Sequence, residues 1–147
     1  MMRRILFGAA LILLALSGMQ TKPPVATSCP TPKRPTLRTP APTPERTVIA
    51  LVNQERTRRG LKALTPNPKM MADAERWSMI QARTKMHHSR MGYGENVAFG
   101  QRTPESVQYA WMNSRGHRAN ILNPCYESIG VGLAYRGSTP YWTQVFQ

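Results

Sequence analysis

Apolar residues recur every three or four positions along three stretches of the chain, which is the spacing of a helix that is buried on one face. Helices are therefore expected over 44–59, over 68–85 and from Pro104 up to Gly116, and a short helical turn is expected to follow over 118–122. The first three begin with a capping residue followed directly by proline, at Thr43-Pro44, Asn67-Pro68 and Thr103-Pro104. A polar cap satisfies free backbone N–H groups, and proline in the first turn loses no hydrogen bond, so these three starts are well marked.

Near the C-terminus the spacing changes from helical to alternating. Apolar residues at 129, 131, 133 and 135 alternate with small ones, and a second alternating run covers 141–146. Turn residues from Gly137 to Pro140 separate the two runs, so they predict an antiparallel hairpin. A third strand is expected over 96–99. Residues 44–147 are therefore expected to form one α+β domain, with helices first and an antiparallel sheet last.

The N-terminal part of the chain has a different composition. Two arginines precede an apolar run from Ile5 to Leu16, which is too short to span a membrane and is typical of a secretory signal peptide. Residues 1–21 are predicted to be that signal peptide or, alternatively, an N-terminal anchor. Residues 22–43 form a basic, proline-rich segment, a composition that favours a disordered, extended linker without a core. We therefore expect the domain to be secreted or extracytoplasmic, and membrane-tethered if the apolar run is retained.

Basic residues are in excess throughout, and the formal net charge is +13. The domain shares this excess, because residues 45–147 hold fourteen basic and seven acidic residues. For an exported protein such charge predicts attraction to an anionic envelope polymer or a lipid surface. Nucleic acid is not an expected partner, because no groove-reading motif accompanies the charge. A basic surface without a specific partner is the alternative interpretation.

The chain has two cysteines, Cys29 in the linker and Cys125 in the domain. Disulfides persist in exported proteins, so a bridge between these two residues is one interpretation. Two free thiols, or lipid attachment at Cys29, are the alternatives.

The candidate chemistry is concentrated between residues 88 and 118. His88 and His117 lie on either side of Glu95 along the chain. Two imidazoles and a carboxylate can bind a divalent cation such as zinc, relay a proton or bind a polar ligand. We predict these three residues as the centre of the site and as tentative metal ligands. Arg118 is added because a guanidinium can contact an anionic ligand.

Other interpretations of the same residues need neither metal nor catalysis. The His and Glu side chains can order the G-E-N loop at 94–96 through hydrogen bonds alone. The G-H-R-A-N block at 116–120 can cap the third helix, with Arg118 and Asn120 bonded to its free backbone groups. Ser89, Ser114 and Cys125 are the nucleophile candidates, but none lies in a nucleophile-elbow motif.

Several motifs occur in a fixed order along residues 45–147. They are L-V-N-Q-E-R at 51–56, H-S-x-x-x-Y-G-E-N-x-A-x-G from His88, A-W-M-N-S-x-G-H-R-A-N-I-L at 110–122, I-G-V-G at 129–132 and Y-W-T-Q-V-F at 141–146. In these motifs the chain resembles the CAP superfamily, and in particular its bacterial SCP-like extracellular domains. The resemblance implies an α-β-α sandwich with a small antiparallel sheet between helical layers. It also implies a cleft lined by two histidines and two acidic residues, which in some members binds a divalent cation.

Carried over to this chain, the resemblance matches His88 and Glu95 directly and leaves His87 as a neighbour. The strand position of the second histidine of eukaryotic members falls at Tyr141, and His117 of the bacterial G-H-R block is the substitute. The second carboxylate falls near Ser114, where this chain has only Glu105 and Glu127 nearby. The sequence therefore predicts a cleft formed by His88, Glu95, Ser114, His117, Arg118 and Tyr141.

The expected function is binding of a cell-envelope or extracellular ligand in this cleft. A metal-assisted hydrolase acting on peptide or envelope polymer is the first alternative. A small-lipid carrier, known among members of the family, is the second.

Overall fold

The computed structural model describes residues 41–147, so the predicted signal segment, most of the linker and Cys29 lie outside the described residues. The elements in chain order are α1 (Pro44–Thr57), β1 (Thr65–Pro66), α2 (Pro68–Arg83), β2 (Gly94–Phe99), α3 (Pro104–Met112), α4 (Arg115–Ile121), β3 (Ser128–Arg136) and β4 (Thr139–Phe146). Among these residues, no helix combines the length and the apolar character needed to cross a membrane.

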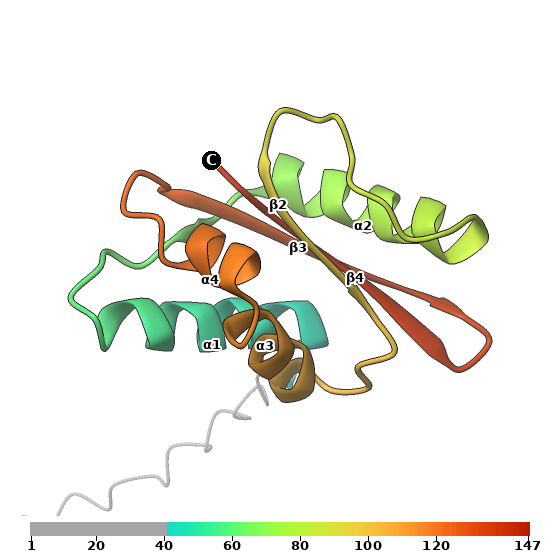
Figure 1. The fold of residues 1–147 in the computed structure, drawn as a ribbon, viewed down its shortest axis with the longest axis horizontal. Helices are drawn as coiled ribbons and strands as arrows, with labels where there is room; N and C mark the ends of the chain where they lie inside the picture. The colour runs from blue at the N-terminus through green and yellow to red at the C-terminus, as the bar shows by residue number, and fades with distance from the viewer. Residues whose placement is uncertain (1–40) are drawn as a thin grey trace, which may run out of the picture. The chain divides into compact units, whose positions relative to one another are not determined.

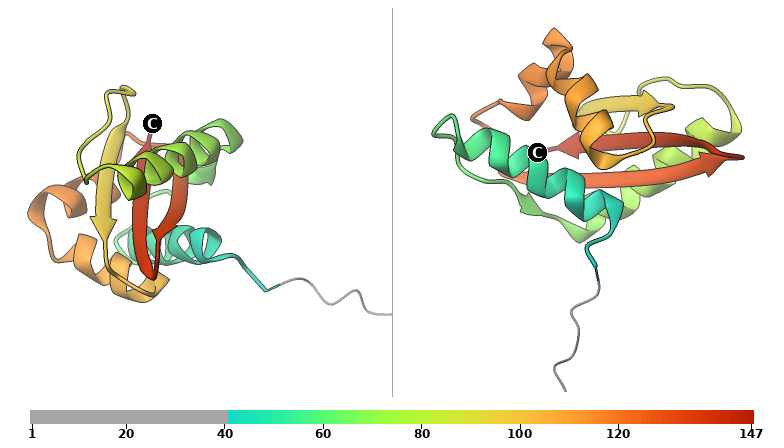
Figure 2. Two further views of the ribbon diagram at one scale, coloured as in Figure 1. Left: turned by 90° about the vertical axis from the view of Figure 1, so that its right-hand side faces the viewer. Right: turned by 90° about the horizontal axis from the view of Figure 1, so that it is seen from below.

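The four strands form one sheet in the order β1-β3-β4-β2. β4 lies in the middle and pairs antiparallel with both β2 and β3, while β1 pairs with the start of β3 in parallel. Helix α2 covers one face of this sheet, and α1 and α3 lie on the other (Figure 1 and Figure 2, left). The predicted α-β-α sandwich and its three antiparallel strands are therefore confirmed.

The backbone of helix α2 lies in direct contact with the backbone of β3, and two glycines of β3 make this close approach possible. A Cβ atom added at Gly130 would lie 2.3 Å from the carbonyl carbon of Met70, and one added at Gly132 would lie 2.2 Å from the backbone nitrogen of Glu75. Neither separation is compatible with a real side chain. The small residues of the I-G-V-G motif thus set the distance between helix and sheet.

The opposite face of the sheet carries the larger hydrophobic core. Trp111 of α3 and Trp142 of β4 are its largest buried side chains, and Val48 and Val52 of α1 pack into the same cluster. Burial of such aromatic side chains supplies much of the stabilisation of a domain of this size.

The three predicted helix starts are confirmed. Thr43 accepts a hydrogen bond from the backbone N–H of Arg46, and Asn67 accepts from those of Lys69 and Met70. At Thr103 the cap is reciprocal, because Ser106 also accepts a bond from the backbone of Thr103.

Several bounds of the expected elements differ. Helix α1 ends at Thr57 rather than at 59, α2 ends at Arg83 rather than at 85, and α4 spans Arg115–Ile121 rather than 118–122. Helix α3 ends at Met112 rather than at Gly116, because Asn113 and Ser114 interrupt the helix and Ser114 becomes the N-cap of α4. The parallel strand β1 was not predicted, since two residues, one of them a proline, give no alternating pattern.

Arg56 at the end of α1 fixes the segment that leads from α4 to β3. Its guanidinium is buried and donates to the backbone oxygens of Lys62, Ile121, Asn123 and Tyr126 at 2.8–3.3 Å. Burial lowers the pKa of Arg56 from its usual value. These bonds to carbonyl oxygens fix the end of α4, which carries His117.

Candidate functional site

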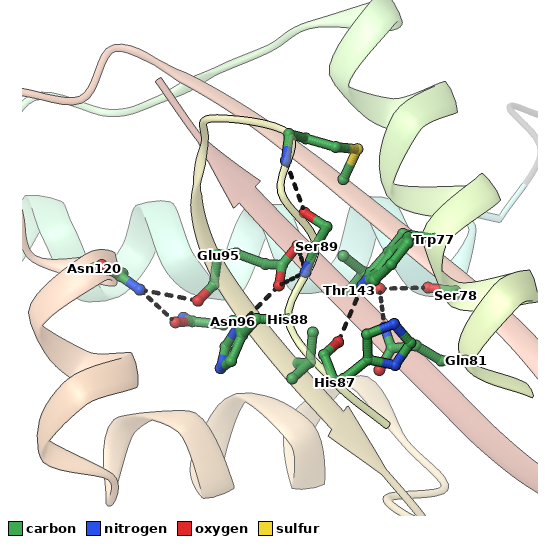
Figure 3. A network of polar contacts seen from close by, with 12 residues as sticks. Trp77, Ser78, Gln81, His87, His88, Ser89, Glu95, Asn96, Asn120 and Thr143 are labelled. Atoms are coloured by element: carbon green, nitrogen blue, oxygen red, sulfur yellow. Dashed lines mark hydrogen bonds and ion pairs between the residues drawn. The ribbon is translucent and has the colours of Figure 1, made fainter. Parts of the chain in front are cut away.

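The core of the site is a contact between His88 and Glu95. Nδ1 of His88 lies 2.8 Å from Oε1 of Glu95 (Figure 3). A carboxylate can only accept, so the imidazole donates this hydrogen bond. The pairing predicted from the spacing of the motif is therefore present in the structure.

Glu95 is fixed more firmly than its partner. The backbone N–H of Ser89 donates to both of its carboxylate oxygens, at 2.9 and 3.2 Å. Its side chain is only 6% exposed, whereas that of His88 is 62% exposed. Glu95 therefore acts as an anchor that orients the imidazole, and the other ring nitrogen, Nε2, is left for a ligand.

His117 lies on α4, and among the described residues its side chain forms no hydrogen bond with His88 or Glu95. Burial lowers its pKa from the usual value of 6.5, and the charge of His88 lowers it further. His117 is therefore neutral at neutral pH.

A network of amide side chains connects α4 to strand β2. Asn120 donates to the backbone oxygen of Glu95 at 3.1 Å and to Oδ1 of Asn96 at 2.9 Å. Asn96 in turn donates to Gln144 at 2.9 Å and to the backbone oxygen of His117 at 3.1 Å. Figure 3 shows Asn120 reaching from α4 towards Glu95 and Asn96. This network fixes His117 and Glu95 relative to each other.

The role of Asn120 differs from the prediction. The sequence placed it as a partner for free backbone groups of the third helix, but its side chain bonds to β2 instead. The G-H-R-A-N block could have indicated a polar contact, although its spacing says nothing of a strand more than twenty residues earlier.

His87 lies outside this arrangement, as the motif alignment predicts. Its Nδ1 lies 2.8 Å from the backbone oxygen of Lys85, and its ring packs edge-on against Trp77 of α2. The indole of Trp77 donates to the backbone oxygen of His87 at 3.2 Å. These contacts attach the loop before His88 to α2 and leave His88 to face Glu95.

A second polar cluster is buried between α2 and β4. Ser78 donates to the hydroxyl of Thr143 at 2.9 Å, and Gln81 donates to the same oxygen at 2.9 Å (Figure 3). Thr143 faces Val97 of β2 across the sheet. Nothing in the spacing of the second helix indicates that Ser78 and Gln81 share this partner.

Within residues 41–147, no hydrogen bond or ion pair joins the side chains of the other three predicted cleft residues to the His88–Glu95 pair. Tyr141 is 4% exposed and stacks on Phe99, at the opposite end of β2 from Glu95. Arg118 lines a groove of about 440 Å³ between α1 and α3, with Glu105 on its wall. Ser114 is the N-cap of α4, and its side chain makes no capping hydrogen bond.

Glu127, the other substitute for the second carboxylate, is an exposed residue paired with Lys62 at 3.3 Å. Cys125 is exposed and has no disulfide partner among residues 41–147.

The described residues do not fit a metal centre. Within residues 41–147, no three or more His, Cys, Asp or Glu side chains are grouped so as to hold a metal ion. Nδ1 of His88 and the Glu95 carboxylate are already bonded to each other. His88, Glu95 and His117 are therefore not grouped as a metal centre in the structure, and metal binding by them stays a prediction.

The arrangement supports hydrogen bonding and proton exchange at an exposed imidazole. The Glu95 carboxylate favours the tautomer of His88 with the proton on Nδ1, so Nε2 can accept a hydrogen bond or a proton. When Nε2 is protonated, the ring is a cation that donates to an anionic oxygen.

Comparison with known proteins places this geometry in a family. Residues 49–146 match the family model described as the cysteine-rich secretory protein family, CAP. An uncharacterized protein of Bacillus subtilis, YkwD, is 39% identical over 117 residues, covering 67% of this chain and 45% of the relative.

Solved structures share the fold. An extracellular protein of Bacillus anthracis that contains an SCP domain matches with a TM-score of 0.62 and 23% identity, over 69% of this chain and 39% of that one. An outer surface protein of Borrelia burgdorferi matches with a TM-score of 0.62 and 16% identity, over 69% of this chain and 89% of that one. The chain thus spans less than half the length of its Bacillus relatives.

Proposed function

The chain belongs to the cysteine-rich secretory protein (CAP) family, and we propose that it is an exported binding domain in which His88 contacts an anionic, hydroxyl-bearing polymer of the cell envelope. The observation that carries this proposal is the exposed imidazole of His88, oriented by the buried carboxylate of Glu95.

The orientation of His88 supports binding because it lowers the cost of forming the complex. An exposed side chain normally loses rotamer freedom when it binds a ligand. His88 is already attached to Glu95, and Ser89 fixes Glu95 in turn. Nε2 is therefore presented to solvent at little further entropic cost.

The electrostatics of the site support an oxygen-rich ligand. His117 has a lowered pKa, so at neutral pH it contributes a neutral ring with one donor and one acceptor. Each of the two imidazoles can donate to or accept from hydroxyl or phosphate oxygens. The basic excess of fourteen to seven over residues 45–147 adds long-range attraction for an anionic polymer.

The names of relatives support an extracellular location. The Bacillus anthracis protein is described as extracellular and the Borrelia burgdorferi protein as an outer surface protein. An apolar run preceded by two arginines at the start of this chain is consistent with export.

The test is a sedimentation assay with purified bacterial cell walls, before and after acid extraction of their anionic phosphodiester polymers. At low salt the chain should be retained by intact walls, and extraction should release most of it. His88→Gln should weaken retention about fivefold or more, in keeping with the loss of a charge-assisted hydrogen bond. The neighbouring variant His87→Gln is the matched control and should bind like the wild type.

Two results would count against the proposal. Equal retention by His88→Gln and His87→Gln would show that charge alone accounts for binding. No retention of the wild type at low salt would remove the anionic polymer as the ligand.

A further inference from the structure

One edge of the sheet has no neighbouring strand over most of its length. β3 is bordered on its outer side only by β1, whose two residues pair with Ser128 and Ile129. β1 stops there because Asn67-Pro68 begins α2 and directs the chain away from the sheet. From Val131 to Arg136, the outer edge of β3 has no strand partner among the described residues.

The backbone groups that face this edge can be identified from the register. In an antiparallel pair, alternate residues direct both N–H and C=O to the same side. Val131 donates its N–H to the sulfur of Met71 at 3.2 Å and therefore points outward, away from β4. Tyr135 lies opposite Pro140, which has no N–H, so this pair is also the outward type. Leu133, between them, must point outward as well.

This edge is bordered by two adjoining grooves. The first, of about 670 Å³, lies between α1 and α2 and is lined by Ile49, Met71 and Val131, among others. The second, of about 350 Å³, continues along β3 and is lined by Met79, Leu133 and Tyr135, among others. Glu75 of α2 lines both grooves, so they run together along the edge.

The chemistry of the edge selects an extended polypeptide. The outward residues repeat at about 6.6–6.8 Å, twice the rise per residue of a strand, which is the spacing that a second strand offers. Apolar walls on both sides suit alternating apolar side chains. A second copy of this domain is a poorer occupant, because α1 and α2 both line the first groove and would meet the helices of the other copy.

The charge of the first groove differs from that of the domain. Glu45 and Glu75 line it together with a single basic residue, Arg46. Neither carboxylate forms an ion pair within residues 41–147, while most other acidic side chains there do. In a domain with twice as many basic as acidic residues, this groove is complementary to a cationic side chain.

From these observations we infer that the open edge of β3 binds an extended peptide segment of a partner protein by strand addition. The peptide carries alternating apolar residues and a lysine or arginine that meets Glu75. This site is separate from the His88–Glu95 pair, and the inference does not depend on the proposed envelope ligand.

The first test is amide hydrogen exchange in the free chain, followed by NMR. Gly132 and Ala134 should be protected by their bonds to β4, whereas Leu133 and Tyr135 should exchange at least tenfold faster. Equal protection of all four amides would show that the edge is already covered and would overturn the inference.

The second test is a selection from a phage-displayed library of random twelve-residue peptides on the full chain. Selected peptides should protect Leu133 and Tyr135 from exchange.

Variants of the chain test how these peptides bind. Tyr135→Pro removes an outward N–H and should weaken their binding tenfold or more, while the matched control Tyr135→Ala should weaken it less than threefold. Glu75→Gln should weaken peptides with a basic residue about threefold or more. His88→Gln should have no effect on this binding.

A peptide-side control keeps the test decisive if Tyr135→Pro disturbs the fold. N-methylation at one set of alternate amides in a selected peptide should abolish binding, and N-methylation at the other set should not. Equal effects of both sets would overturn strand addition, as would a library that yields no peptide. Concentration-dependent dimers that Tyr135→Pro dissociates would assign the edge to a second copy instead.

Discussion

The β2 edge and the β3 edge of the sheet differ in whether other parts of the chain bond to their outward backbone groups. At the β2 edge, side chains from the helices bond to the outward carbonyls: Asn120 of α4 donates to Glu95 at 3.1 Å, and Trp111 of α3 donates to Val97 at 3.3 Å. At the β3 edge, Met71 bonds to Val131, and Leu133 and Tyr135 have no such partner among the described side chains. One edge is therefore covered by helices and the other is open.

The difference separates two kinds of binding surface within one small domain. Where helices cover the edge, they also fix polar side chains, and the His88–Glu95 pair lies there. Where the chain turns away at Pro68, the strand keeps its hydrogen-bonding capacity for another molecule. The covered edge is thus suited to contact single polar groups of a ligand, and the open edge to pair with a peptide backbone.

The largest loss of stability is expected when Trp111, which covers the β2 edge, is removed. Trp111→Ala should destabilise the domain by about 3–5 kcal/mol, because it empties a buried indole site and leaves the carbonyl of Val97 unpaired. Denaturant unfolding followed by circular dichroism measures the change. Tyr109→Ala on the same helix, where the side chain is 73% exposed, is the control and should change stability by less than about 0.5 kcal/mol.

Trp111→Phe sharpens this result. It removes the N–H together with part of the buried ring, so a loss of about 1–3 kcal/mol is expected from the unpaired carbonyl of Val97 and the smaller side chain together. A phenylalanine variant as stable as the wild type would show that the bond to Val97 adds nothing to stability.

Removal of Asn120 should have the next largest effect. Asn120→Ala leaves the carbonyl of Glu95 and the amide oxygen of Asn96 without this donor, at a cost of about 1–3 kcal/mol. The matched control is Asn113→Ala, since that exposed amide bonds only within its own helix, to Tyr109. Similar unfolding midpoints for the two variants would contradict a role of Asn120 in connecting α4 to β2.

The difference between the edges also marks the limit of what the sequence could predict. Helix starts and the hairpin depend on near neighbours, and caps such as Asn67-Pro68 carry a local signal, so they were predicted correctly. The His88–Glu95 pair was predicted because its seven-residue spacing belongs to a family motif. The bonds of Asn120 and Thr143, by contrast, join residues more than twenty positions apart, and periodicity does not show which side chains meet.

Tyr141 illustrates the same limit within a motif. It was predicted as a cleft residue because it occupies a family position near the T-Q-V sequence. In the structure it lies opposite Phe99, four residues along β4 from the partner of Glu95. The register of β2 and β4 shows that Tyr141 lies away from Glu95, and this register could not be predicted from the sequence.

A smaller effect is expected in the pH dependence of stability. The folded state lowers the pKa of His117 below 6.5, so the unfolded chain binds the proton more readily. The stabilisation is therefore complete above the ordinary pKa and is lost as the pH falls from there through the lowered pKa. Thermal unfolding between pH 7.5 and pH 4.5 should show this loss, and His117→Gln should reduce it.

His87→Gln is the control for this measurement, because it removes an imidazole outside the Glu95 network. That variant should still lose stability over the same range. An unchanged profile in His117→Gln would mean that other groups account for the acid sensitivity.

The smallest change in the free energy of unfolding is expected for substitutions at the open edge of β3. Tyr135 is 58% exposed, and its outward backbone groups have no partner to lose. Tyr135→Ala should therefore change the free energy of unfolding by less than about 0.5 kcal/mol, and Tyr135→Pro by little more, because an edge position needs no N–H for the sheet itself. Denaturant unfolding of both variants measures this directly. A cost of several kcal/mol for Tyr135→Pro but not for Tyr135→Ala would show that the N–H is already bonded within the fold, and the two edges would then differ less than the structure indicates.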